Sequence, residues 1–62
     1  MNMYRIDVTS YVNRRVKNMA VAISADNAIE ASCKGVTEVC ELTGMDIDAV
    51  TKIEATLETG AV

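Results

Sequence analysis

The chain contains no histidine, proline, phenylalanine or tryptophan, and two tyrosines are its only aromatic residues. Without histidine, the Ser-His and Cys-His pairs that activate nucleophiles cannot form, and the commonest general base is missing. Without proline there is no cis-proline turn and no polyproline segment. We therefore expect no enzymatic activity, no catalytic residue, no bound metal and no cofactor.

Long apolar runs are also missing, since none approaches the roughly 18 residues of a membrane-spanning helix. The first residues, Met1 to Arg5, mix polar and apolar side chains, unlike the charged and then apolar order of a secretory signal peptide. These features predict a cytoplasmic protein without membrane contact.

The chain has 62 residues, which predicts a single small domain over residues 1–62. A domain of this size buries only about 60% of the surface that its unfolded chain exposes. With few large side chains to bury, a stable monomer is not assured, and pairing with a second copy is a common way to bury more surface.

Two β-strands are predicted near the N-terminus, over residues 3–12 and 17–25, where polar and apolar residues alternate with a period of two. The apolar residues occupy even positions in the first segment and odd positions in the second. The short connection between the segments predicts an antiparallel hairpin.

The register of this hairpin is constrained by the change of parity. Opposed residue numbers must have an odd sum if both apolar sets are to face one core. We expect a sum of 29, which places Ile6 opposite Ile23. A loop of four residues, 13–16, would then connect the strands, because Arg14 and Arg15 are not residues that a type I′ turn favours.

A helix is predicted over residues 27–43. Asp26 or Asn27 can cap its N-terminus, Glu30 stands in a capping-box position after Asn27, and Gly44 is typical of a helix end. Helical spacing predicts a buried stripe of Ala28, Ile29, Ser32, Cys33, Val36, Val39 and Cys40.

Three residues within this helix carry further expectations. Gly35 costs about 1 kcal/mol relative to alanine, so either another segment approaches closely there or the glycine is tolerated by chance. Cys33 and Cys40 would lie about 10 Å apart along the axis, too far for a disulfide. We expect two small buried hydrophobic residues, with a reactive or intermolecular thiol as the alternative.

A third strand is predicted over residues 49–58 from its threonine, valine and isoleucine content, although a helix also fits the spacing of its apolar residues. The expected inward residues are Thr51, Ile53, Ala55 and Leu57. Residues 60–62 are expected to form a frayed tail.

The predicted order is therefore β-β-α-β, an α+β fold with a three-stranded antiparallel sheet in the order 2-1-3. Its single helix covers one face of the sheet, connected in the right-handed sense. The other face stays open, and a homodimer is one way to cover it.

Six residues are candidates for interaction: Tyr11, Arg14, Arg15, Lys17, Ala20 and Ala22. The two alanines would leave a shallow dent in the open face that could accept a side chain or a second sheet. The three cations would make the hairpin tip basic, since residues 1–25 have a net charge of +3 and residues 26–62 of −6. A basic tip can contact phosphate groups.

The run Ser24-Ala25-Asp26-Asn27-Ala28-Ile29-Glu30-Ala31, after a short hairpin, resembles small accessory proteins of phages and mobile elements. The likeness covers residues 4–42. The β-β-α-β order is also similar to that of short phage inhibitors of uracil-DNA glycosylase, which are acidic dimers that grip the DNA-binding groove of the enzyme with a helical face. The resemblance implies a phage or mobile-element origin, and thus a place in the host cytoplasm if a phage encodes the chain. It carries no site residue over to this chain.

We therefore expect a small non-enzymatic protein-interaction module that forms a homodimer, with a host protein as a further partner. One alternative is a nucleic-acid binder that uses the basic hairpin tip. The other is an acidic inhibitor or DNA mimic of a host enzyme, because eight carboxylates follow residue 25.

Overall fold

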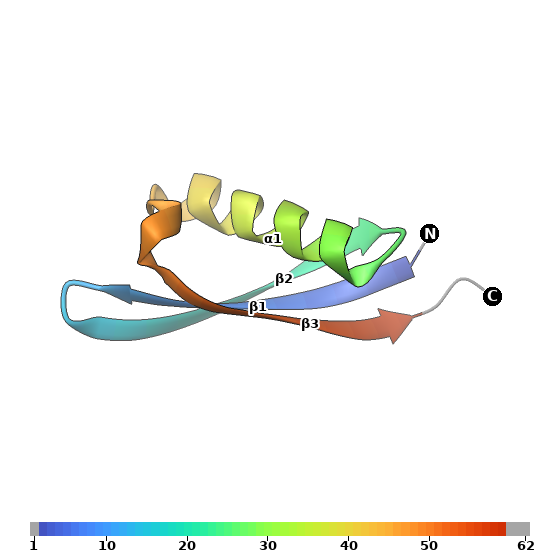
Figure 1. The fold of residues 1–62 in the computed structure, drawn as a ribbon, viewed down its shortest axis with the longest axis horizontal. Coiled ribbons are helices and arrows are strands. Elements are labelled where there is room, and N and C mark those ends of the chain that lie inside the picture. Colours follow the sequence, from blue (N-terminus) through green and yellow to red (C-terminus); the bar gives the residue numbers. More distant parts are fainter. Residues whose placement is uncertain (1, 60–62) are drawn as a thin grey trace.

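Each predicted alternating segment forms a strand, and the capped segment between the second and third strands forms a helix (Figure 1). The computed structural model describes residues 2–59. Its elements are β1 (Asn2–Val12), β2 (Arg15–Ala25), α1 (Ala28–Thr43), a 3-10 turn η1 (Ile47–Ala49) and β3 (Val50–Thr59). The tail predicted at 60–62 lies outside the described residues.

The three strands form one antiparallel sheet in the order β2-β1-β3, and α1 packs across one face of it (Figure 1). This arrangement confirms the predicted α+β fold and the β-β-α-β order. It also decides in favour of a strand, not a helix, after η1.

The β1–β2 turn is tighter than predicted. Asn13 and Arg14 have φ angles of 53° and 63°, and positive φ at both central residues is the mark of a type I′ turn. Asparagine enters this left-handed region more readily than most residues, which makes a two-residue turn accessible here. The predicted four-residue loop is therefore wrong.

The register of the hairpin shifts with the turn. Opposed residues sum to 27, so Ile6 lies opposite Val21 and not opposite Ile23. The predicted parity holds, because an odd sum still places the apolar residues of both strands on one side. The error is thus a slip of two residues, which leaves every side chain on its predicted face.

The ends of α1 match the predicted signals. The side chain of Asn27 accepts a hydrogen bond from the N–H of Glu30 at 2.8 Å. At the other end Gly44 has a φ of 71° and donates its N–H to the carbonyl of Cys40 at 2.9 Å. Both contacts satisfy backbone groups that a helix leaves unpaired at its ends.

The buried stripe of α1 is rotated from the predicted one and consists of Ala31, Gly35, Val36 and Val39. Ile29 is 79% exposed, and Cys33 is also exposed. The reason is the contact between Gly35 and β1: a Cβ at position 35 would lie 2.6 Å from Cγ2 of Ile6. This close approach requires glycine and turns its side of the helix toward the sheet.

The core lies between α1 and the sheet. Its buried hydrophobic residues are Tyr4, Ile6, Val8, Ile23, Ala25, Ala31, Val36 and Val39. Cys40 is half-buried against this core, which confirms the prediction of a buried residue in part, whereas the prediction of a buried Cys33 is wrong. Both thiols are free.

The third strand is irregular at both ends. β3 pairs with β1 without interruption only over residues 52–57, and the register shifts beyond this stretch leave Thr51 and Glu58 without an opposed residue. The shift at Thr51 changes the alternation, so Val50 and not the predicted Thr51 packs against the core. Ile53 and Leu57 face the core side, as predicted, but remain 41% and 55% exposed.

Candidate interaction surfaces

The six residues predicted for interaction do not form one site. Tyr11, Ala20 and Ala22 belong to the open face of the sheet, while Arg15 and Lys17 lie on the opposite side, where their partners in β1 are Val12 and Ser10. Arg14 occupies the turn itself. The alternation of a strand separates the two sets, because neighbouring side chains point to opposite faces.

The open sheet face is largely polar. Ala20 and Ala22 lie opposite Asp7 and Arg5, whose side chains form an ion pair of 3.3 Å. Other polar side chains on this face also contact one another. The Asn18 amide donates to the hydroxyl of Thr9 at 3.0 Å, and the Lys52 ammonium lies 3.5 Å from a carboxylate oxygen of Glu54. The alanines therefore border paired charges instead of forming an apolar patch. A polar surface of this kind does not favour the binding of an apolar partner.

The hairpin tip extends beyond the C-terminal end of α1 (Figure 1). An 11-residue strand spans roughly 36 Å, whereas the 16-residue helix spans about 24 Å. Tyr11 and Val16 are opposed near the tip and are 53% and 71% exposed. Within residues 2–59, none of the three tip cations, Arg14, Arg15 and Lys17, forms an ion pair.

A groove of about 530 Å³ separates the projecting hairpin from the end of α1. Its hairpin wall includes Val12, Lys17 and Met19, and its other wall includes Met45 and Asp46. No sequence pattern predicts this groove, because it depends on how far the hairpin overhangs the helix. Its walls carry one cation, one anion and flexible apolar side chains.

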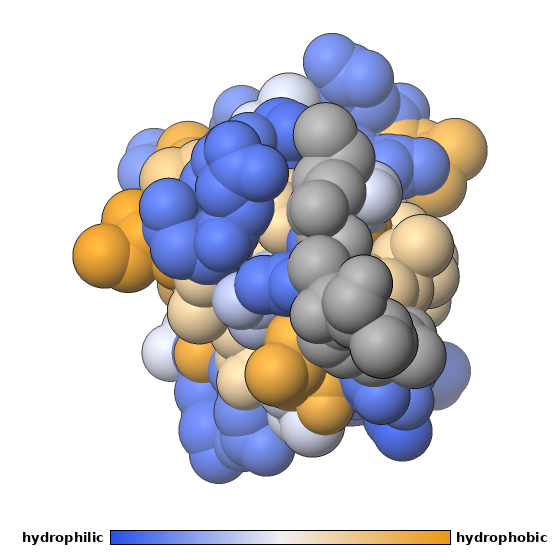
Figure 2. Space-filling view, turned by 90° about the vertical axis from the view of Figure 1, so that its right-hand side faces the viewer, coloured by the Kyte–Doolittle hydropathy of each residue, from blue (hydrophilic) through white to orange (hydrophobic). Residues whose placement is uncertain are grey.

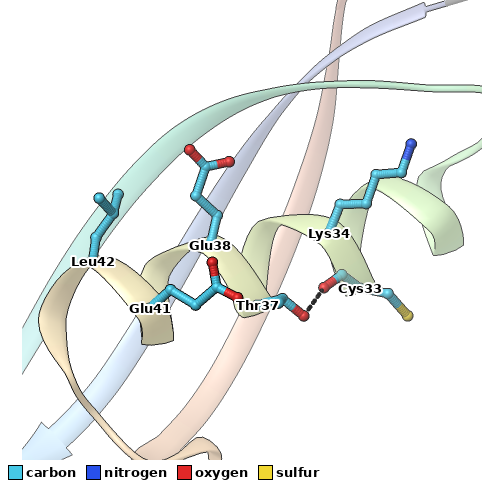
Figure 3. Close-up of a pocket in the computed structure, with 6 residues that line it drawn as sticks. All are labelled: Cys33, Lys34, Thr37, Glu38, Glu41 and Leu42. Atoms are coloured by element: carbon cyan, nitrogen blue, oxygen red, sulfur yellow. Dashed lines mark hydrogen bonds between the residues drawn. The ribbon is translucent and has the colours of Figure 1, made fainter.

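The outer surface of α1 holds a shallow hollow of about 560 Å³ (Figure 3). Two rows of side chains diverge there: Lys34, Glu38 and Leu42 on one side, and Cys33, Thr37 and Glu41 on the other. All six belong to one helix, and the Thr37 hydroxyl donates to the Cys33 carbonyl at 2.9 Å. The hollow is therefore a feature of an exposed helix surface.

Lys34 connects this helix surface to neighbouring groups. Its ammonium lies 2.8 Å from a carboxylate oxygen of Glu30. The hydrogen bond from Lys34, and then its positive charge, lower the pKa of Glu30 from its usual value. The same ammonium lies 3.5 Å from the carbonyl oxygen of Ser24, so this side of α1 faces the outer edge of β2.

That outer edge is a further surface, which was not among the predicted interaction sites. β2 pairs with β1 over eleven consecutive residues without a register shift. The last eight residues of β2, from Asn18 to Ala25, carry no charge, and the strand contains no proline. This uncharged run was visible in the sequence, but its position at an edge follows only from the strand order β2-β1-β3.

Figure 2 views the molecule from the end at which β1 begins and β3 ends. Where described residues are visible in this view, hydrophobic side chains lie among hydrophilic ones. Over residues 2–59, no group of three or more histidine, cysteine, aspartate or glutamate side chains is placed to hold a metal ion. In the same part of the chain, no helix is long and apolar enough to cross a membrane.

The geometry thus offers a long uncharged strand edge, a basic projecting tip and a charged helix surface. Comparison of the chain with protein-family models, with curated proteins and with solved structures finds no match.

Proposed function

We propose that this chain is a small non-enzymatic protein-interaction module that acts as a homodimer and originates from a phage or mobile element. The observation that carries the homodimer is the small core. Among residues 2–59, the large side chains that are fully buried are Ile6, Val8 and Val39. Domains of this size commonly rely on association to bury enough apolar surface.

The exposed apolar side chains support the same proposal. Nine large hydrophobic side chains in residues 2–59 are more than a third exposed: Met3, Tyr11, Val16, Met19, Ile29, Leu42, Ile47, Ile53 and Leu57. A partner chain that covered several of them would add to the apolar surface removed from water, at about 25 cal/mol per Å².

Sedimentation velocity over a range of protein concentrations tests this proposal. We expect the chain to sediment as a dimer at micromolar concentration and to dissociate on dilution, because the monomer retains its own core. A single species with the mass of one chain throughout the micromolar range would contradict the homodimer.

A second candidate function is nucleic-acid binding through the hairpin tip. It is favoured by the projection of the tip and by the lack of ion pairs for Arg14, Arg15 and Lys17 within residues 2–59. Such binding would weaken steeply with salt, since each phosphate contact releases counterions. A gel-shift assay at low salt, with the three cations changed to glutamine as the control, tests it: no retardation of the unaltered protein would exclude this function.

A further inference from the structure

The backbone groups of β2 face two ways. In an antiparallel ladder, alternate residues direct both their N–H and C=O groups to the same neighbour. The Ser24 carbonyl accepts from Lys34 of α1, which assigns Ser24 to the set that faces away from β1. Every second residue belongs with it, so the outward-facing residues are Val16, Asn18, Ala20, Ala22 and Ser24.

This row of outward-facing groups lacks the usual protection of a sheet edge. Natural edges are blunted by charged residues, prolines, bulges or a covering segment. From Asn18 to Ala25, β2 has none of the first three. Among residues 2–59, the contact from Lys34 to the last of these carbonyls, at 3.5 Å, is the covering interaction at this edge.

We propose that the outer edge of β2 pairs antiparallel with β2 of a second copy, so that two sheets join into one of six strands. This inference rests on the proposed homodimer and specifies its geometry. Outward-facing residues must meet outward-facing residues, so opposed residue numbers have an even sum. A sum of 40 is the value that pairs all eleven residues of both strands.

The charges and side chains of β2 fit this register. Ala20 lies opposite Ala20 of the second copy at the two-fold axis, and Lys17 lies opposite Ile23. No two cations face each other, and the basic start of each strand runs toward Asp26, which follows the end of the other strand. Arg14 of each copy comes beside Asp26 of the other, and neither residue has an ion pair within residues 2–59.

The helices would lie on the same face of the joined sheet, since opposed side chains of paired strands share a face. Lys34 reaches Ser24 of β2, so the row that it forms with Glu38 and Leu42 flanks the shared edge (Figure 3). Leu42 is 68% exposed and Met19 of β2 is 37% exposed. The second copy would cover both side chains, which gives the seam an apolar component.

Cysteine cross-linking tests the register directly. In a background with Cys33→Ser and Cys40→Ala, Ala20→Cys would bring two thiols together at the two-fold axis. Hydrogen-bonded antiparallel pairs have a Cα separation of about 5.5 Å, which lies within the range of a disulfide. The matched control is Ala22→Cys, on the same strand and face, whose two copies would be displaced by about 13 Å along the strands.

We expect mild oxidation to convert most of the Ala20→Cys protein into a covalent dimer, with little conversion of the Ala22→Cys protein. Equal conversion, or conversion at Ala22→Cys alone, would overturn this register. If the Cys33→Ser, Cys40→Ala background protein sediments as a dimer but its Ala20→Cys variant does not cross-link, the β2 pairing is wrong and the homodimer remains supported. A monomeric background protein would overturn both.

A charge variant provides an independent measurement in case oxidation perturbs the fold. Ala20→Lys would place two lysines directly opposite each other, and we expect the dimer dissociation constant to rise about tenfold or more. Ala22→Lys faces Asn18 and should change the constant by less than about threefold. Circular dichroism of both variants checks that the monomer fold is retained, and an equal effect of the two lysines would contradict the register.

Discussion

The two edges of the sheet, β2 and β3, flank the same central strand but differ in regularity and charge. β2 follows β1 over eleven residues without interruption, whereas β3 does so over 52–57 alone. Charged residues interrupt β3 at Lys52, Glu54 and Glu58, while β2 is uncharged from Asn18 onward. One edge therefore has the protection that prevents strand addition, and the other is a template for it.

The contrast arises from how each strand is connected to β1. A two-residue turn at Asn13 and Arg14 starts β2 directly opposite the end of β1, so the ladder is regular from its first pair. β3 instead arrives from η1, and the Thr51 hydroxyl donates to the Thr9 carbonyl at 3.3 Å beside the register shift. A tight turn produces a regular edge, and a longer connection produces an irregular one.

The largest expected effect is a change in assembly state when the charged side chains that protect the β3 edge are removed. In the triple variant Lys52→Thr, Glu54→Thr and Glu58→Thr, both edges would be open to pairing, and we expect discrete dimers to be replaced by open-ended assemblies. Light scattering over time measures the change. The matched control is Glu41→Gln on α1, which alters the net charge by the same +1; equal aggregation of the two proteins would contradict the role of the edge.

Proline substitutions distinguish the two sides of β2. Val21→Pro removes an N–H that faces β1, and we expect a loss of about 2–4 kcal/mol in the free energy of unfolding. Ala22→Pro removes an N–H that faces outward, where edge strands tolerate proline, and should cost about 1 kcal/mol or less. Urea unfolding, at protein concentrations low enough that the chain is monomeric, compares the free energies of unfolding of the two variants. If Ala22→Pro were the more damaging change, the assignment of outward-facing groups would be wrong.

Both edge strands flank β1, whose packing against α1 depends on the contact between Gly35 and Ile6. A substitution at Gly35 tests this contact. Gly35→Ala would place a methyl group 2.6 Å from Cγ2 of Ile6, which is fully buried. We expect a net loss of about 1–2 kcal/mol, because overpacking outweighs the gain of about 1 kcal/mol in helix propensity. Thermal unfolding measures it, with Glu38→Ala as an exposed control in the same helix, and a raised melting temperature would contradict the close packing.

The smallest effect concerns the ion pair beside the β2 edge. Lys34 lowers the pKa of Glu30 through its hydrogen bond and charge, so the pair stabilises the fold at neutral pH. This contribution disappears as the pH falls through the lowered pKa of Glu30, where the carboxylate becomes protonated in both states. We expect Glu30→Gln to lower the urea midpoint slightly at about pH 7, and by progressively less as the pH falls below the usual Glu pKa of 4.5. If the difference in urea midpoint between the unaltered protein and Glu30→Gln grew on acidification, the stabilising role of the ionised Glu30 would be contradicted.

Much of the fold was predictable because its signals are local. Alternation identified all three strands, and Asn27 and Gly44 marked the ends of the helix. The candidate site was less predictable. Of the six residues expected to interact, Ala20 and Ala22 border an ion pair on the open face, and the same two positions acquire their proposed role only through the outward direction of their backbone groups.

By itself, the sequence determined which segments are strand or helix, which side of each strand is apolar, and where the charges lie. These properties depend on the period of the side chains and on capping residues close by in the chain. Only the tertiary structure decided the register of the hairpin, the rotation of α1 about its axis and the unequal protection of the two edges. Each of these depends on contacts between distant residues, such as Gly35 with Ile6 and Lys34 with Ser24, whose geometry no local pattern specifies.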